Sequence, residues 1–223
     1  MSEQIKSMFN KISRRYDLLN DILSFGIHRF WKKRVIRELE LSPDDLLLDV
    51  CTGSGDLIFE AKKSCNLLAE PIGVDFSFEM QKIAKSRGSL YQINADAMKL
   101  PFVDSTFTAL TCSYGIRNVD QPLVALKEFY RVLRSGSRVV VLEFGVPHGV
   151  LGFFCNLYSN MILPIIGGFF SKNRDAYSYL PESISKFPYG KNFVNLMESA
   201  GFSDISVKSF FFGISYLYYG KKK

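Results

Sequence analysis

From about residue 46 onward, short apolar runs alternate with segments that carry helical spacing. This alternation is typical of a parallel sheet whose strands are joined by crossover helices. The strands that we predict cover residues 45–51, 70–76, 89–96, 106–115 and 137–144, and the predicted helices cover 55–65, 77–88, 121–136 and 191–202. Two β-rich runs within 204–220, broken near Gly213, resemble an antiparallel pair at a sheet edge.

The pattern therefore predicts an α/β fold with an open, mostly parallel sheet of about seven strands, helices on both faces and an antiparallel last strand. Ligands of such sheets bind at the carboxyl ends of the strands. The length suits a single domain over residues 1–223. Residues 1–42 carry helical periodicity and are predicted to form an N-terminal helical cap.

Residues 149–190 interrupt the alternation, and we expect them to form an apolar lid or substrate insertion. The first part, 149–171, has no charged residue over a length that could cross a bilayer. Pro164 and two adjacent glycines interrupt it, which weakens the case for a spanning helix. A helix buried over the sheet or covering a ligand, a surface that touches lipid, and a true span all remain open.

Composition excludes several classes of protein. The four cysteines form no CxxC motif and suit buried thiols in a reducing cytosol, and two histidines make a metal site unexpected. The charged N-terminus is not a signal peptide, so we expect a cytoplasmic protein. The net charge of +6 comes from basic clusters near the two ends, and no nucleic-acid signature runs between them.

A glycine turn follows the first strand in LLLDVCTGSGDL. Gly53 and Gly55 stand where a side chain would stop the backbone from approaching a ligand. A dinucleotide fingerprint would have a third glycine at the position of Ile58, and Asp56 places a negative charge at the helix start. The turn therefore favours a nucleoside ligand without phosphates.

Acidic residues stand at or near the ends of the first three strands. Asp75 ends the second strand about twenty residues after the turn, from where a carboxylate can bind ribose hydroxyls. Asp96, beside Ala97, ends the third strand and could accept from an adenine amine, and Asp49 lies in the first strand. Aspartates after strands also start turns or cap helices. Three of them behind one glycine turn favour the ligand site.

The stretch SYGIRNVD sets Arg117 and Asn118 directly after a buried strand. One interpretation is structural, in which Arg117 bonds an acidic residue and Asn118 caps the next helix. The other places both side chains at the carboxyl edge of the sheet, facing a substrate.

The chain resembles a known family over almost its whole length. The motifs that carry the resemblance are FNKISRRYDLLNDILSFGIHRFWKK, LDVCTGSGDL, GVDFSFEM, DAMKLPFVDSTF, SYGIRNVD, FYRVLRSGSRVVVLEF, YSYLPESISKFP and MESAGF. They are similar to the ubiquinone/menaquinone biosynthesis C-methyltransferases, which are class I S-adenosylmethionine-dependent enzymes with a Rossmann-like fold. YDLLN, GIRN and YLPESI are the motifs specific to this family.

The resemblance implies methyl transfer from S-adenosylmethionine to a ring carbon of a polyprenylated quinol. Demethylmenaquinol is the preferred acceptor, and the benzoquinol step of ubiquinone biosynthesis is the second. A methyltransferase for another small acceptor, or a non-catalytic cofactor-binding subunit of a quinone-synthesis complex, is the alternative. The expected cofactor contacts are Asp49, Gly53, Ser54, Gly55, Asp75, Asp96, Ala97 and Ser113.

The acceptor carbon becomes nucleophilic when a phenolic proton of the quinol is removed. Arg117 would lower the pKa of that phenol, but its own pKa above ~12 excludes it as the base. A water held by Arg117, Asn118 and Tyr16, or the carboxylate of Asp17, would accept the proton. No metal is required.

Because the quinol tail resides in lipid, we expect peripheral contact with the inner face of the membrane. A homodimer is left open. At the C-terminus the family tends toward GIVALHRG, whereas this chain has GISYLYYG, so Tyr218 and Tyr219 replace a histidine and an arginine.

Overall fold

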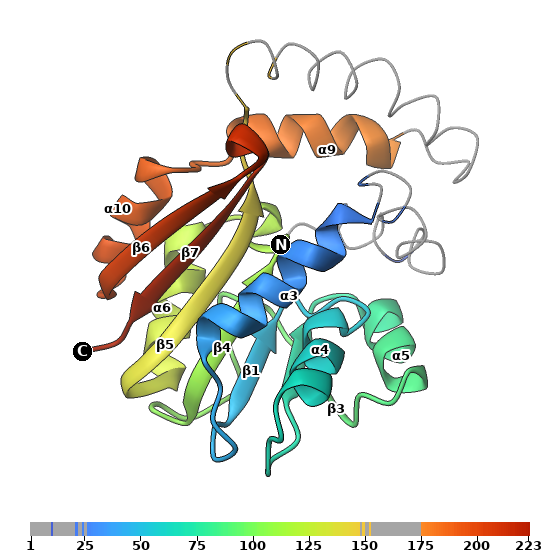
Figure 1. The fold of residues 1–223 in the computed structure, drawn as a ribbon. Helices are drawn as coiled ribbons and strands as arrows, with labels where there is room; N and C mark the ends of the chain where they lie inside the picture. The colour runs from blue at the N-terminus through green and yellow to red at the C-terminus, as the bar shows by residue number, and fades with distance from the viewer. Residues whose placement is uncertain are drawn as a thin grey trace.

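The computed structural model describes residues 26–147 and 175–223, together with residues 10, 21, 24, 149 and 152. Figure 1 shows the fold. In chain order the described elements are α3 Ile27–Leu39, β1 Leu47–Val50, α4 Asp56–Ser64, β2 Ile72–Asp75, α5 Phe78–Ser86, β3 Tyr91–Asn94, β4 Phe107–Ser113, η2 Ile116–Asn118, α6 Pro122–Val132, β5 Leu133–Phe144, α9 Asp175–Lys186, α10 Lys191–Ser199, β6 Ser203–Phe210, η4 Phe211–Gly213 and β7 Ser215–Lys221.

The seven strands form one sheet in the order β3-β2-β1-β4-β5-β7-β6. Strands β1 to β5 pair in parallel, and β7 is antiparallel to both of its neighbours. This confirms the predicted mostly parallel seven-stranded sheet and the antiparallel last strand. It also brings the carboxyl ends of β1, β2, β3 and β4 to one edge, as parallel pairing requires.

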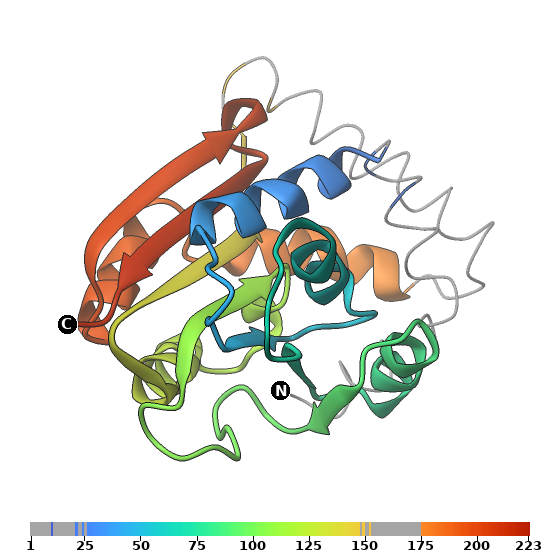
Figure 2. The same ribbon diagram turned by 60° about the horizontal axis from the view of Figure 1, so that its bottom comes forward.

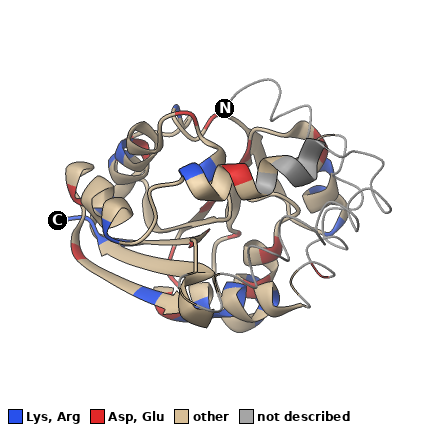
Figure 3. Cartoon of the chain, turned by 90° about the horizontal axis from the view of Figure 1, so that it is seen from above, with Lys and Arg blue, Asp and Glu red and all other residues tan. Residues whose placement is uncertain are grey.

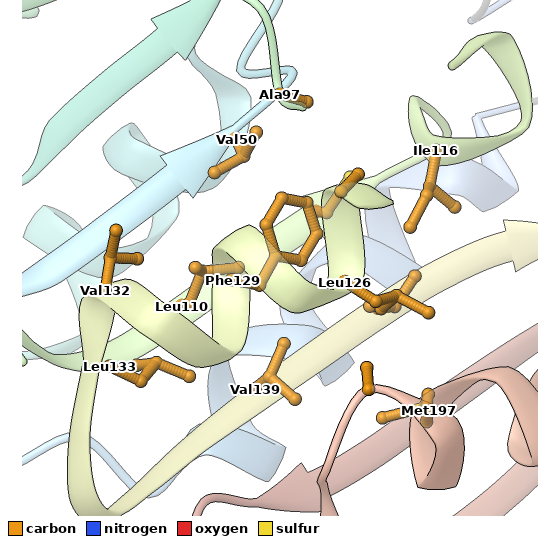
Figure 4. Packing of buried hydrophobic residues seen from close by; sticks show 14 of the residues in the cluster. Val50, Ala97, Leu110, Ile116, Leu126, Phe129, Val132, Leu133, Val139 and Met197 are labelled. Carbon is orange, nitrogen blue, oxygen red and sulfur yellow. The ribbon is translucent and has the colours of Figure 1, made fainter. Parts of the chain in front are cut away.

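Helices cover both faces of the sheet, because its strands are apolar on both sides. The buried side chains of α3 and α4 pack on one face and those of α6 and α10 on the other (Figures 1 and 2). In Figure 4, Phe129 of α6 lies among Leu110 of β4 and Val139 of β5, with Val50 of β1 and Met197 of α10 at the margins. This core holds the strand ends of the site in place.

The start of β5 differs from the prediction. The helix predicted over 121–136 ends at Val132, and Leu133 begins the strand by pairing with Phe107. The ladder then shifts register before Ala109 pairs with Arg138. Leu133 is completely buried, so its pairing and burial override the helical spacing of the sequence around it.

The predicted cap and the predicted insertion are described only in part. Helix α3 lies within the cap, and Tyr16 and Asp17 lie outside the described residues. Of the insertion, α9 is described, and it lies across the carboxyl edge of the sheet (Figure 1). Among the residues that the structure describes, none of the helices has the length and apolar character needed to cross a bilayer.

Tyr218 is a core residue of β7. Its side chain is completely buried and its ring lies 4.6 Å from that of Phe193 in α10. Its hydroxyl oxygen accepts a 2.6 Å hydrogen bond from the backbone N–H of Gly190. Burial raises the pKa of this phenol. Tyr218 therefore joins the last strand to the start of α10, and Tyr219 next to it is half-buried.

Candidate active site

The glycine turn between β1 and α4 has a backbone that other residues rarely adopt. Gly53 and Gly55 have φ values of +55° and +89°. A Cβ atom at Gly53 would meet nothing within 4 Å, whereas one at Gly55 would lie 3.0 Å from the ring of Phe59. One side of the turn is thus open to a ligand and the other is packed against α4.

Asp75 joins the end of β2 to this turn. Its Oδ2 accepts a 2.8 Å hydrogen bond from the N–H of Gly53, and its Oδ1 accepts one of the same length from the N–H of Ser77. Burial raises the pKa of the carboxyl group, and the hydrogen bonds from Ser77 and Gly53 oppose that shift. The backbone N–H of Phe76 also donates to this carboxylate, and a carboxylate has about four acceptor sites, so Asp75 can still accept a hydroxyl group.

Asp49 lies in β1, just before the glycine turn, and is 1% exposed. Its two oxygens accept 2.7 Å hydrogen bonds from the hydroxyls of Thr111 and Thr52. Burial raises its pKa to about 6, although both hydroxyls favour the charged form. Because Thr52 begins the turn, these bonds make Asp49 a support for its backbone.

Asp56 is paired from both sides. Lys32 of α3 donates to its Oδ2 at 2.7 Å, and Arg87 donates to its Oδ1 at 2.8 Å. Burial opposes ionisation, but the two cations lower the pKa of Asp56 to about 2. Arg87 also donates to the carbonyl oxygen of Ser54 in the turn. The sequence analysis used the negative charge of Asp56 to favour a ligand without phosphates. Because two cations compensate this charge, Asp56 repels a phosphate less than an unpaired carboxylate would.

The remaining expected cofactor contacts lie at the ends of β3 and β4. Asp96 follows β3, and its Oδ1 accepts a 2.9 Å hydrogen bond from the N–H of Met98. Ala97 is buried beside it. Ser113 ends β4, and its buried Oγ finds no hydrogen-bond partner within the described part of the chain.

These features fit an adenosyl cofactor. The open side of Gly53 leaves room next to the backbone, Asp75 can accept from a ribose, and the Oγ of Ser113 offers an unused donor and acceptor. The parallel register places the three at neighbouring strand ends.

Arg117 forms a buried ion pair with an acidic residue, which is the structural one of the two interpretations that the sequence allowed. Its Nη1 donates at 2.8 Å to Oε1 of Glu143, and the two side chains are 6% and 0% exposed. The backbone N–H of Arg117 donates to Oε2 of Glu143 at 3.2 Å, and Nη1 also donates to the carbonyl oxygen of Tyr114. The guanidinium lies 5.2 Å from the ring centre of Phe144. Glu143 thus holds η2 to the end of β5.

Asn118 points toward α9. Its Oδ1 accepts a 2.9 Å hydrogen bond from the hydroxyl of Tyr179, and its side chain is buried. Burial raises the pKa of Tyr179, and nearby Arg117 opposes the shift. The residue at the N-cap of α6 is Gln121, which makes no side-chain capping bond, so the alternative role of Asn118 as that cap is wrong.

The structure adds two residues to those found from the sequence. Glu143 and Tyr179 contact Arg117 and Asn118 directly. Glu143 is a charged residue within the apolar run VVVLEF, just as Arg117 is a charged residue after a buried strand. The two unusual charges could have been predicted from the sequence to form an ion pair. Nothing in the sequence pairs Tyr179 with Asn118, because the bond joins residues 61 positions apart.

Figure 3 looks down on the carboxyl edge and shows α9 crossing in front of it. The structure therefore brings five features to one edge of the sheet: the glycine turn, Asp75 at the end of β2, Asp96 after β3, Ser113, and the Arg117–Glu143 pair.

Solved methyltransferase structures share this fold. A possible histamine N-methyltransferase from Thermotoga maritima matches with a TM-score of 0.70 and 20% identity, over 97% of this chain and 99% of the other. A putative S-adenosylmethionine-dependent methyltransferase from Methanococcus maripaludis matches with a TM-score of 0.68 and 18% identity, over 96% and 93%.

Sequence relatives are more similar. The ubiquinone/menaquinone biosynthesis C-methyltransferase UbiE of Geotalea daltonii is 40% identical over 99% of this chain and 97% of its own length. The demethylmenaquinone methyltransferase of Staphylococcus saprophyticus is 37% identical over the same shares. The sequence model of the ubiE/COQ5 methyltransferase family matches residues 1–222. The chain therefore belongs to the ubiE/COQ5 methyltransferase family and is an S-adenosylmethionine-dependent methyltransferase.

Proposed function

We propose that the protein methylates a ring carbon of a polyprenylated quinol and converts demethylmenaquinol to menaquinol. The observation that carries this proposal is the full-length likeness to relatives with that activity in their names. The benzoquinol step of ubiquinone biosynthesis is the second candidate, because the Geotalea daltonii relative is named for both pathways.

S-adenosylmethionine supplies an electrophilic methyl group and a thioether leaving group when it is bound. In our proposal Asp75 binds the ribose hydroxyls, Asp96 and Ala97 meet the adenine, and Ser113 hydrogen-bonds the cofactor through its Oγ. Asp49 and the turn of Gly53, Ser54 and Gly55 keep the backbone close to the ligand. The support for these roles is the open side of Gly53 and the unused hydrogen-bonding capacity of Asp75 and Ser113.

The acceptor side of the proposed site is the turn after β4. Because Glu143 compensates the charge of Arg117, we assign to Arg117 mainly the positioning of the ring, with Asn118 beside it. The phenolic proton passes to a water held by Arg117, Asn118 and Tyr16, or to Asp17. The parts of Tyr16 and Asp17 in this proposal rest on the sequence motif.

The proposed setting is the cytoplasmic side of the membrane. A quinol with an isoprenoid tail partitions into lipid, so the protein would act as a peripheral membrane protein, with residues 149–190 as an apolar lid of a single 223-residue domain. A homodimer belongs to the same proposal.

The test is methyl transfer from labelled S-adenosylmethionine to a short-chain naphthoquinol kept reduced. We expect a methylated quinol with the reduced acceptor and no product with the oxidised quinone, because the oxidised ring carbon is not a nucleophile. Benzoquinols, sterols and simple phenols serve as competing acceptors. Cofactor binding without transfer to any quinol would refute the proposed activity and favour the non-catalytic subunit.

A further inference from the structure

Three aromatic side chains stand out on the surface next to α3. Phe30 of α3 and Phe211 and Phe212 of η4 are 59%, 52% and 80% exposed. Trp31 connects the two elements, because its ring centroid lies 6.1 Å from that of Phe210 and 5.8 Å from that of Phe211. Three exposed rings on adjacent elements are more than the isolated apolar residues that most soluble surfaces carry.

The backbone of η4 holds two of these rings in an unusual conformation. Phe211 and Phe212 have φ values of +47° and +56°, in the left-handed region that bulky residues rarely occupy. Such residues persist only where the surrounding structure requires them, and they concentrate at functional sites. The turn is closed by a hydrogen bond from the N–H of Ile214 to the carbonyl oxygen of Phe211. The outward display of both rings is therefore part of how β6 and β7 are joined.

The exposed face of α3 is basic. Arg29, Lys33 and Arg37 are spaced four residues apart, so they share one side of the helix, and each is exposed. Arg29 is paired with Asp21, so Lys33 and Arg37 supply the charge of this face. The one acidic residue within α3, Glu38, is paired with Lys208 of β6 and lies 3.7 Å from Arg34. The exposed surface beside the aromatic rings thus carries positive charge.

The same edge of the sheet carries η4 and the proposed acceptor site. Phe144, which ends β5, pairs with Ser215 of β7, and Ser215 pairs with Phe210. The N–H of Gly145 donates at 3.1 Å to the carbonyl oxygen of Ile214, which follows η4. Figure 1 shows η4 and α9 at this edge. Any extended apolar phase in contact with η4 would therefore also lie next to the turn after β4 that carries Arg117.

We propose that Phe30, Phe211, Phe212 and the basic face of α3 form a docking surface for a bilayer that contains anionic lipid. Aromatic rings partition to the level of the headgroups, and Lys and Arg are attracted to the negative surface. The benefit to catalysis rests on the proposed function, because only a lipid-resident acceptor needs this placement. The binding itself does not depend on that function.

Co-sedimentation with vesicles tests the proposal on the full chain. Phosphatidylglycerol-containing vesicles are compared with pure phosphatidylcholine vesicles, at low and high salt. The aromatic variant is Phe211→Ser with Phe212→Ser, and the charge variant is Lys33→Glu with Arg37→Glu. The matched controls are Phe78→Ser, whose ring is 53% exposed on α5, and Lys63→Glu with Lys85→Glu, two exposed lysines near the ends of α4 and α5.

The wild-type protein should bind the anionic vesicles and lose that binding at high salt. One basic residue near an anionic surface contributes about fivefold in partitioning, so the charge variant should bind at least roughly 25-fold more weakly. Loss of two interfacial rings should weaken binding by about tenfold, and the controls should bind like the wild type. Trp31, the one tryptophan in the sequence, touches Phe211 and reports vesicle binding of the wild type by its fluorescence.

Unchanged binding of both surface variants would overturn the proposal, as would a wild-type protein that ignores anionic vesicles. A vesicle-free dimer that the surface variants dissociate, with no lipid binding, would make the surface a contact between two copies and would also overturn it. Methyl transfer to a soluble short-chain quinol should be the same in all variants. Failure of the wild type in that assay would count against the proposed function alone.

Discussion

Replacement of Glu143 by glutamine tests the buried ion pair most directly. The carboxylate accepts hydrogen bonds from Arg117 Nη1 at 2.8 Å, from the Arg117 N–H at 3.2 Å and from the Phe144 N–H at 2.8 Å. Glutamine keeps one acceptor oxygen, removes the negative charge and places an NH₂ group against a backbone N–H. Because neither side chain reaches bulk water, the arginine charge loses its compensation in a poorly solvated site.

Loss of one partner of such a pair costs about 3–5 kcal/mol, which is a large part of the about 5–15 kcal/mol that stabilises a typical domain. The matched control is Glu70→Gln, which breaks the half-exposed ion pair with Lys62 and should cost less than about 1 kcal/mol. Urea unfolding measures both free energies. Equal effects of the two substitutions would refute the reasoning that burial makes the Glu143 pair special.

Activity separates a positioning role from a stabilising one. Glu143→Gln should lower kcat for the reduced quinol more than it weakens S-adenosylmethionine binding. The substitution loosens the attachment of η2 to β5, whereas the contacts that hold the glycine turn stay intact. Arg117→Leu combined with Glu143→Leu should recover much of the stability, since an apolar pair often replaces a buried ion pair without loss. That double variant should remain inactive, and a fully active one would remove Arg117 from the proposed site.

Three further predictions concern pH, packing and a buried hydrogen bond. The pKa of Asp49 rises on folding from its usual value to about 6, so the free energy of unfolding should fall by about 3 kcal/mol as the pH rises through that window; Asp49→Asn should flatten this fall in cofactor-free urea titrations. Gly115→Ala should cost about 1–3 kcal/mol, because its Cβ would lie 2.2 Å from that of Cys51. Adding Cys51→Gly should restore stability, because it removes that Cβ and glycine adopts the positive φ of residue 51 without strain. Tyr218→Phe should cost about 1–3 kcal/mol in thermal or urea unfolding, because it leaves the N–H of Gly190 without its acceptor; an unchanged stability would show that water replaces the hydroxyl.

The strand and helix pattern was predictable from the sequence because it depends on local spacing of apolar residues and on turn chemistry. Runs such as residues 45–51 and 106–115 are apolar enough to require burial on both faces, which leaves a parallel sheet as the solution. The prediction that the helix continues to residue 136 was wrong from Leu133 onward, because strand pairing with Phe107 outweighs the local helix propensity. Boundaries depend on such contacts between distant residues, and spacing alone cannot report them.

The candidate site divides in the same way. The glycine turn, the acids at the strand ends and the family were predictable from the sequence, because each lies in a contiguous motif. The fold was needed to show that Asp49 supports the turn, that Asp56 is neutralised and that Arg117 is paired with Glu143. The ionisation and role of a charged side chain depend on its partners and its exposure, and both are set by residues that only the folded sheet brings together.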